Sequence, residues 1–133
     1  MRVSVVVPAL NEESGIAAAV SSAWSFGAAE VIVADGGSGD ATCGIAAEAG
    51  AEVVSSLPGR AVQQNAGAAG SSGEVLLFLH ADCRLPSGGV QQIEVALQDP
   101  AVVGGSFRQR IEDPAWLYRW LERGNAWRAA WRQ

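Results

Sequence analysis

Short apolar runs recur along the chain. Five of them carry the β-branched and apolar residues that are typical of strands, at residues 2–8, 29–34, 51–55, 75–79 and 101–108. Apolar residues that follow one another without a polar break predict strands covered on both faces, as in a parallel sheet. The run at 75–79 is the clearest, and we expect it to form a central strand.

The segments between these runs have helical spacing. Asn11 is a good N-cap, and the two acids after it suit the positive end of a helix, so a first helix is predicted from there to Gly27. Its apolar face would comprise Ile16, Ala19, Val20, Ala23 and Trp24. Asp40 predicts the cap of a second helix, which ends before Gly50. Two more helices are predicted at residues 60–69 and 87–98.

Strands and helices thus alternate through most of the chain. This alternation predicts an α/β fold in which a mostly parallel sheet has helices on both faces. Right-handed crossovers bring the carboxyl ends of the strands to one edge, where ligands bind in open α/β sheets. The loops at residues 8–12, 35–40 and 80–84 should therefore gather on one rim. We expect Pro8 to close the first strand, since proline donates no hydrogen bond to a ladder.

The composition fits one small domain with a single core. The chain has 133 residues, of which 49% are hydrophobic. No apolar run approaches the roughly 18 residues of a membrane span, and the start does not resemble a signal peptide. Cys43 and Cys83 have neither a disulfide-framework nor a zinc-ligand spacing. We therefore expect a cytoplasmic protein, with peripheral contact at the inner membrane face as an alternative.

Charge is divided unevenly along the chain. The net charge is −5; residues 1–107 hold 3 Arg and 11 acids, giving −8, and residues 108–133 hold 6 Arg and 3 acids, giving +3. An acidic body argues against nucleic-acid binding, which needs a broad basic surface. The chain has no Lys to complete a P-loop. A bound phosphate would have to be met by a metal, an Arg or backbone N–H groups.

Four polar residues are candidates for chemistry on the predicted rim. Asp35 precedes three glycines in four positions and can accept a hydrogen bond from a base or ribose, or simply stabilise its turn. Asp82 can bind Mg²⁺ or Mn²⁺, or cap a turn. Arg60 can pair with a phosphate or base, or be a solvated surface charge. His80 can hydrogen-bond a ribose or phosphate, or be structural.

The last segment, residues 113–133, has a different composition. Asp113 and Pro114 predict the start of a helix. One face of it would carry Trp116, Trp120, Trp127 and Trp131. Three interpretations stay open: packing on the sheet, a surface for a homodimer or a membrane, or a surface that further sequence would cover. We predict an α/β domain at residues 1–112 and a Trp/Arg-rich helical segment at 113–133.

Four segments of the chain resemble the family 2 glycosyltransferases, which have the GT-A nucleotide-diphosphosugar fold. Residues 5–13 (VVVPALNEE) resemble the opening of that family, and residues 30–42 (EVIVADGGSGDAT) its second-strand signature. Residues 59–67 (GRAVQQNAG) resemble its Arg/Lys…Asn-x-Gly segment, and residues 77–82 (LFLHAD) occupy the place of its D-x-D metal motif. The whole set looks closest to the bacterial radical-SAM/selenodomain-associated transferases.

The resemblance implies a role for each matching residue. The nucleotide-binding residues would be Pro8, Ala9, Glu12, Asp35, Arg60, His80 and Ala81. Among these, Asp35 would contact the base, usually uracil or guanine, and Arg60 the base or the diphosphate. Asp82 would bind the Mg²⁺ or Mn²⁺ that bridges the diphosphate. The chain departs from the family pattern where His80 and Ala34 stand in place of acids.

The resemblance also implies a reaction. A UDP- or GDP-sugar would donate its sugar to an unknown acceptor in an inverting displacement, with the acceptor hydroxyl activated by a carboxylate. Relatives carry that base in a second half, so we expect it beyond Gln133. Two alternatives stay open: a catalytically incomplete nucleotide-binding module that pairs through the Trp-rich segment, and, with less support, a nucleotidyltransferase of the same fold.

Overall fold

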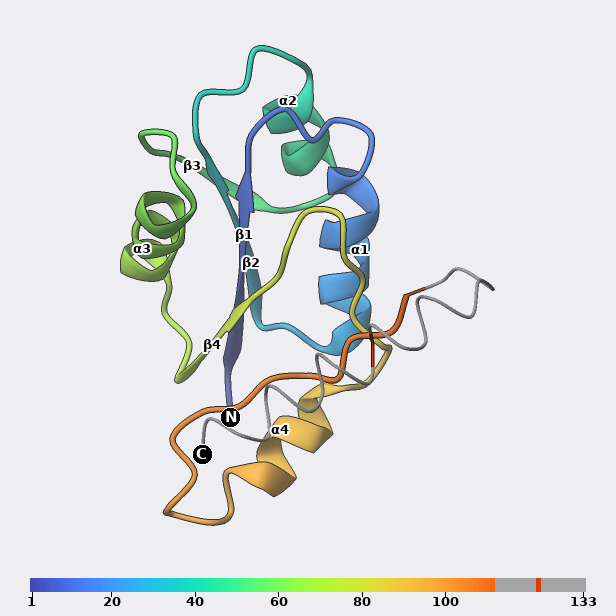
Figure 1. Ribbon diagram of the computed structural model, residues 1–133, viewed down its shortest axis with the longest axis vertical. Helices are drawn as coiled ribbons and strands as arrows, with labels where there is room; N and C mark the ends of the chain where they lie inside the picture. The colour runs from blue at the N-terminus through green and yellow to red at the C-terminus, as the bar shows by residue number, and fades with distance from the viewer. Residues whose placement is uncertain (112–121, 123–133) are drawn as a thin grey trace. The chain divides into compact units, whose positions relative to one another are not determined.

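The computed structural model describes residues 1–111 and residue 122 (Figure 1). Its elements are β1 (Val3–Ala9), α1 (Ile16–Phe26), β2 (Glu30–Asp35), α2 (Thr42–Glu48), β3 (Glu52–Ser55), α3 (Arg60–Gly70), β4 (Val75–Phe78) and α4 (Val90–Ala96). Strands and helices alternate, so the predicted α/β class is confirmed. Contacts divide the chain into Met1–Ala96 and Leu97–Gln133. The predicted helical segment at 113–133 lies outside the described residues, apart from residue 122.

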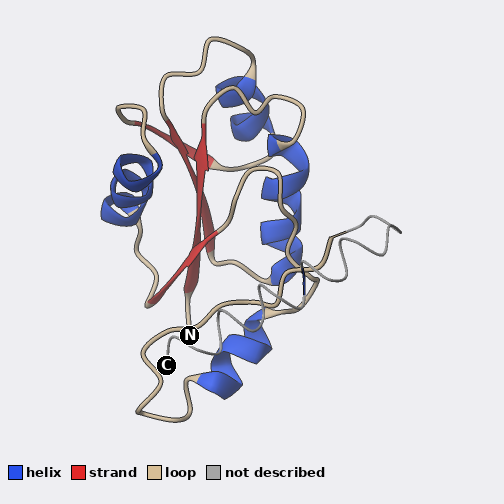
Figure 2. Ribbon diagram, in the orientation of Figure 1, coloured by secondary structure: helices blue, strands red, loops and turns tan. Residues whose placement is uncertain are grey.

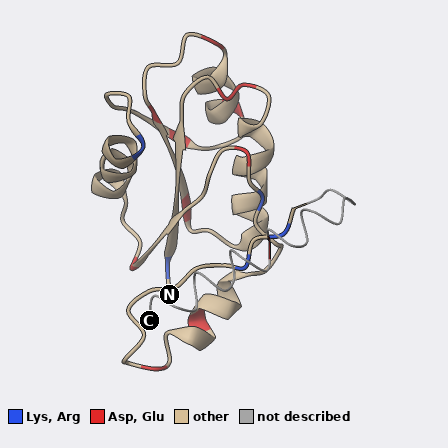
Figure 3. Cartoon of the chain, viewed as in Figure 1, with Lys and Arg blue, Asp and Glu red and all other residues tan. Residues whose placement is uncertain are grey.

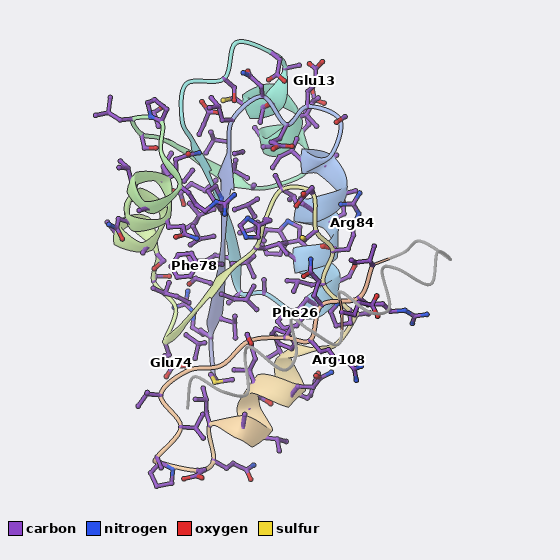
Figure 4. The ribbon with its side chains drawn as sticks, in the orientation of Figure 1. Glu13, Phe26, Glu74, Phe78, Arg84 and Arg108 are labelled. Atoms are coloured by element: carbon purple, nitrogen blue, oxygen red, sulfur yellow. The ribbon has the colours of Figure 1, made fainter. Side chains whose placement is uncertain are left out.

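The four strands form a parallel sheet in the order β3-β2-β1-β4. The central strands are β1 and β2, and the prediction that residues 75–79 form a central strand is wrong. In the described part of the chain β4 lies at the edge, where Leu76 and Phe78 are 42% and 46% exposed. Figure 4 labels Phe78 on this strand. An apolar run shows that a strand is partly buried, but the order of strands depends on pairing over long sequence distances.

Helices cover both faces of the sheet, as predicted. Side chains alternate along β1, so Val5 and Val7 point to one face and Val6 to the other. Val5 and Val7 belong to a core that includes residues of α1 and α2. On the other face, a Cβ at Gly67 of α3 would overlap with the Val6 side chain, so glycine lets α3 lie close to β1. Figure 2 shows α3 on one side of the sheet, with α1 and α2 on the other.

Pro8 does not close the first strand, because β1 continues through it to Ala9. The Val6 carbonyl accepts a hydrogen bond from the Leu79 N–H at 2.9 Å, on the β4 flank of β1. Pro8 is two residues further on, so its nitrogen faces the same flank, where β4 has already ended at Phe78. The ladder therefore needs no N–H at this position.

The first helix begins later than Asn11 and the two acids after it predict. Asn11 does not cap it, since its φ of 54° is left-handed and α1 starts only at Ile16, without a side-chain cap. Trp24 does not belong to the buried face either: it is 39% exposed, whereas Phe26 is fully buried. Gly27 ends the helix as predicted, with a φ of 105° that favours glycine.

The part of the chain after β4 has less regular structure than predicted. The expected helix at 87–98 is shorter, at Val90–Ala96. The expected strand at 101–108 is wrong, because residues 97–111 form neither a helix nor a strand. Val103, in the middle of that run, is 97% exposed. Among the described residues no helix is long and apolar enough to cross a membrane.

Glu30, at the amino end of β2, fastens the connection between α3 and β4. Its carboxylate accepts the N–H groups of Ser72 at 2.5 Å and Gly73 at 3.1 Å, and the hydroxyl of the buried Ser4. The Ser4 hydroxyl is the main reason that the pKa of Glu30 is lowered. A Cβ at Gly73 would overlap with Ser4 Oγ, so only glycine fits there. This end of the sheet is thus closed by its own polar contacts.

Candidate functional site

The loops at the carboxyl ends of the strands meet, as predicted. Asn11, in the loop after β1, donates its N–H to Ser38 Oγ at 2.9 Å, and its side-chain oxygen accepts the Gly39 N–H at 2.9 Å. The loop after β4 reaches the same place, because a Cβ at Gly15 would lie 3.0 Å from the Ala81 carbonyl oxygen. Figure 1 shows the loops after β1 and β2 together at one end of the sheet. We call this region the rim.

Asp35 ends β2 and is 5% exposed. One carboxylate oxygen accepts the N–H groups of Gly37 and Ser38, both at 2.9 Å, and the other accepts the Ser38 hydroxyl at 2.5 Å. Burial by itself would raise the pKa of Asp35, but these hydrogen bonds outweigh it and lower the pKa. Asp35 therefore stabilises its own turn as an ionised carboxylate, and its contact with a ligand stays a prediction.

A second hydroxyl joins the same two loops. Thr42 is fully buried, and its hydroxyl donates to Asp40 at 2.5 Å while accepting the Glu12 N–H at 2.9 Å. Asp40 also accepts the Thr42 N–H at 3.0 Å, at the start of α2. In return, Glu13 accepts the Ala41 N–H at 3.1 Å. The acids after β1 are therefore part of an interlock between two loops rather than a helix cap.

The glycine-rich loop has already used most of its backbone donors. N–H groups that donate to acceptors within the protein are those of Gly36, Gly37, Ser38, Gly39, Ala41 and Thr42. A phosphate-binding loop needs such groups to point at the ligand. The glycines here instead let the loop fold back on Asp35 and Asn11. Backbone N–H groups of this loop are therefore poor candidates for phosphate binding.

The remaining candidates, Arg60, His80 and Asp82, are exposed. We call these three residues the open side of the rim, in contrast to its interlocked side, which is formed by the joined loops after β1 and β2. Arg60 is the first residue of α3 and is exposed, and no described acid forms an ion pair with it. His80 is exposed as well. The exposed Asp82 accepts a hydrogen bond from the Cys83 thiol at 3.3 Å. Burial, followed by the neighbouring Asp82, raises the pKa of the Cys83 thiol.

A cation would find one protein ligand at Asp82 rather than a complete cage. Within residues 1–111 and 122, no three His, Cys, Asp or Glu side chains gather as a metal site. The carboxylate is nevertheless a hard oxygen donor that faces solvent, which suits Mg²⁺ or Mn²⁺ in a shell completed by phosphate and water. The residues present therefore fit a cation that arrives together with a phosphate ligand.

Gln63 joins segments of the rim, and sequence reasoning missed this residue. It lies on α3 and is 5% exposed. Its amide nitrogen donates to the carbonyl oxygens of Ala9 at 2.7 Å and Ala34 at 3.0 Å, and its oxygen accepts the Gly59 N–H at 3.2 Å. The available signal was a polar residue on the apolar side of a small-residue helix, but Gln64 beside it gave the same signal.

Charge on the rim is mainly negative. The acids on the rim loops are Glu12, Glu13, Asp35, Asp40 and Asp82, whereas the only cations on those loops and at the start of α3 are Arg60 and Arg84. Figure 3 shows the acids on the loops at this end of the sheet. A nucleoside diphosphate would meet net repulsion here unless a cation accompanied it.

Comparison with known proteins defines the class of this chain. Residues 4–131 match the family model of glycosyl transferase family 2, and the chain belongs to that family. No curated protein matches the chain. The fold is the GT-A nucleotide-diphospho-sugar transferase fold, as the solved structures that resemble it show.

Similar solved structures include several of glucosyl-3-phosphoglycerate synthase from Mycobacterium tuberculosis. One matches with a TM-score of 0.64 and 31% identity over 75% of this chain and 41% of that chain. A complex of that enzyme with Mn²⁺, UDP and glucosyl-3-phosphoglycerate matches with a TM-score of 0.60 and 31% identity, over 77% of this chain and 40% of that chain. A complex with Mn²⁺, UDP-glucose and phosphoglyceric acid gives the same four values. This chain therefore spans well under half of the length of these relatives.

Proposed function

We propose that this chain binds a nucleoside diphosphate sugar on the rim, together with a divalent cation held by Asp82, and serves in transfer of the sugar. The observation that carries this proposal is the division of the rim. Its interlocked side is held by internal hydrogen bonds, and its open side leaves Arg60 and Asp82 exposed in a family of nucleotide-sugar enzymes. Pro8, Ala9 and Glu12 would line the nucleotide pocket, and Asp35 would face the base.

The dependence on a cation follows from charge and from hydrogen bonding. Phosphate needs positive partners or free N–H groups, and most N–H groups of the glycine-rich loop already donate to Asp35, Asn11 and other protein acceptors. Arg60, Arg84 and a cation at Asp82 are the remaining partners on an acidic rim. When bound, the cation would act as a Lewis acid toward the departing diphosphate. Asp82 would hold it, and Arg60 would orient the phosphates or the base.

The donor we propose is a UDP-sugar, because similar solved structures contain UDP or UDP-glucose with Mn²⁺. The acceptor of those relatives, phosphoglyceric acid, is a property of those enzymes. For this chain we propose an inverting displacement whose catalytic base lies beyond Gln133, in keeping with its share of the relatives' length. Pairing through the Trp-rich segment stays a prediction on residues that are not described.

Calorimetric titration of the 133-residue chain tests this proposal. UDP and GDP are each added with Mn²⁺, with Mg²⁺, or with a chelator. We expect UDP to bind in the presence of either cation and to bind much more weakly with the chelator. Equal UDP affinity with and without cation would contradict the proposed role of the metal. Absence of binding by either nucleotide under all conditions would contradict the proposed donor site.

A further inference from the structure

We propose that Gln63 is the positioning residue of the donor site: one buried amide sets the spacing between the strand ends and the start of α3. This inference rests on the proposed function for its effect on nucleotide affinity. Its structural content, the coupling of three segments by one side chain, can be tested without any nucleotide.

The amide of Gln63 has no hydrogen-bonding capacity to spare on its donor side. A glutamine amide offers two N–H donors and one carbonyl oxygen. Both donors go to carbonyl oxygens at the ends of the central strands, those of Ala9 in β1 and Ala34 in β2, at 2.7 and 3.0 Å. The oxygen accepts the Gly59 N–H at 3.2 Å, just before α3. At 5% exposure, water cannot readily replace these partners.

Each partner of Gln63 is itself, or directly precedes, a residue proposed to contact the nucleotide. Ala9 belongs to the proposed pocket, Ala34 precedes Asp35, and Gly59 precedes Arg60. The Ala9 carbonyl also accepts the Gly36 N–H at 3.0 Å, which draws the loop after β2 to the same point. The base-facing and phosphate-facing groups are thus held at a fixed separation by a side chain that need not touch the ligand.

The glycine at position 36 leaves room for this amide. A Cβ at Gly36 would lie 3.0 Å from the side-chain carbon of the Gln63 amide and 3.1 Å from its nitrogen. Such contacts are tight enough to require the amide to shift. Gly39, in the same loop, has nothing within 4 Å of an added Cβ, and neither glycine has a positive φ. Gly36→Ala and Gly39→Ala are therefore a matched pair: the added Cβ crowds the Gln63 amide in the first variant and contacts nothing in the second.

Hydrogen exchange tests the positioning role directly. Gln63→Met keeps the length of the side chain but removes both donors and the acceptor. We expect exchange at Gly59, whose N–H loses its acceptor, to accelerate by about ten-fold or more, the loss of roughly one hydrogen bond. Exchange at Gly36 should accelerate less, because its N–H keeps the Ala9 carbonyl as acceptor and is affected only through the displaced strand end. At Gly59 the effect should be smaller in Gly36→Ala and absent in Gly39→Ala. Exchange at Gly73, at the other end of the sheet, should stay as in the wild type. Uniform acceleration at all these amides would show that Gln63 only contributes stability, and would overturn the proposal.

Nucleotide affinity tests the consequence for the site. With Mn²⁺ present, Gln63→Met should weaken UDP binding by about ten-fold, and the loss should extend to uridine, because the base-facing segment is displaced too. Glu30→Gln loosens the opposite end of the sheet and should leave both affinities unchanged. Loss of UDP binding that spares uridine, or equal losses in the two variants, would overturn the proposal.

A conservative variant adds a pH readout. Gln63→Glu would place a carboxyl group against two carbonyl oxygens, which repel the ionised form and favour the protonated form as a donor. We expect its UDP affinity, relative to that of the wild type, to recover as the pH is lowered from 8 to 6. A constant ratio would contradict the role of Gln63 as a donor. If wild-type protein binds no UDP, the proposed function fails, while hydrogen exchange still decides the role of Gln63.

Discussion

The two sides of the rim use the same residue types in opposite ways. On the interlocked side, Asp35 is 5% exposed and its carboxylate accepts three hydrogen bonds from Gly37 and Ser38. On the open side, Asp82 is exposed and accepts one weak hydrogen bond from a thiol. A carboxylate with three internal partners mainly holds its loop in place, whereas one with more free acceptor sites is better suited to bind a cation. The two aspartates should therefore respond differently to the same substitution.

The largest effect is expected from Asp82→Ala. Removal of the only carboxylate proposed to hold the cation should lower the Mn²⁺-dependent affinity for UDP by about ten-fold or more. Stability should change by no more than about 0.5 kcal/mol, because the side chain is exposed. Calorimetry and urea unfolding measure the two quantities. Glu94→Ala, at an exposed acid on α4, is the control and should change neither. Retained metal dependence in Asp82→Ala would assign the cation to another ligand.

Asp35→Ala should show the reverse emphasis. The N–H groups of Gly37 and Ser38 would lose their acceptor, so we expect the free energy of unfolding to fall by about 1–3 kcal/mol. Asp35→Asn keeps one acceptor oxygen and should lose less. Urea unfolding, with the slope compared to confirm a two-state transition, measures the difference. Equal stability of Asp35→Ala and wild type would mean that water replaces the carboxylate, and that the comparison between the two sides fails.

A smaller effect is expected where the interlock depends on a hydroxyl. Thr42→Val preserves the shape of a fully buried side chain but leaves the Glu12 N–H without its acceptor at 2.9 Å. We expect a loss of about 1 kcal/mol, together with faster hydrogen exchange at Glu12. Ser21→Ala, at an exposed position on α1, serves as the control in urea unfolding. An unchanged exchange rate at Glu12 would contradict the interlock.

The sequence predicted the fold well wherever the signal was local. Alternation of apolar runs and helical spacing, with breaks at Gly27 and Gly50, gave the element order and the gathering of loops on one rim. It could not give the order of the strands, since the edge position of β4 depends on which strands pair. The run at 101–108 shows the same limit, because a strand exists only when another strand pairs with it.

The site was less predictable than the fold, for a physical reason. The exposed candidates, Arg60 and Asp82, were found from their positions after Pro-Gly and after a strand. The roles of Asn11 and Thr42 were missed because local rules assign such residues to caps, and a contact between two loops wins over the cap here. Gln63 was missed because its partners, Ala9 and Ala34, are distant in sequence and bind through their backbones.

The smallest expected effect concerns the dependence of stability on pH. It involves carboxylates at both ends of the sheet. Burial opposes ionisation at Asp35, Asp40 and Glu30, most of all at Asp35, but hydrogen bonds, chiefly from the hydroxyls of Ser38, Thr42 and Ser4, lower the pKa of each. Groups with a lowered folded-state pKa stabilise the protein above their unfolded pKa of about 4, and the stabilisation is lost as the pH falls through the folded value.

Stability should therefore be constant near neutral pH and should fall below about pH 4. Glu30→Gln should make this loss of stability at acid pH less steep, because it removes one of the three groups. It should not alter UDP binding at pH 7, since Glu30 lies at the amino end of β2, away from the rim. Urea unfolding at a series of pH values measures how the free energy of unfolding depends on pH. If stability falls as steeply with pH in Glu30→Gln as in the wild type, Glu30 keeps its ordinary pKa, and only the rim carboxylates are held ionised by the fold.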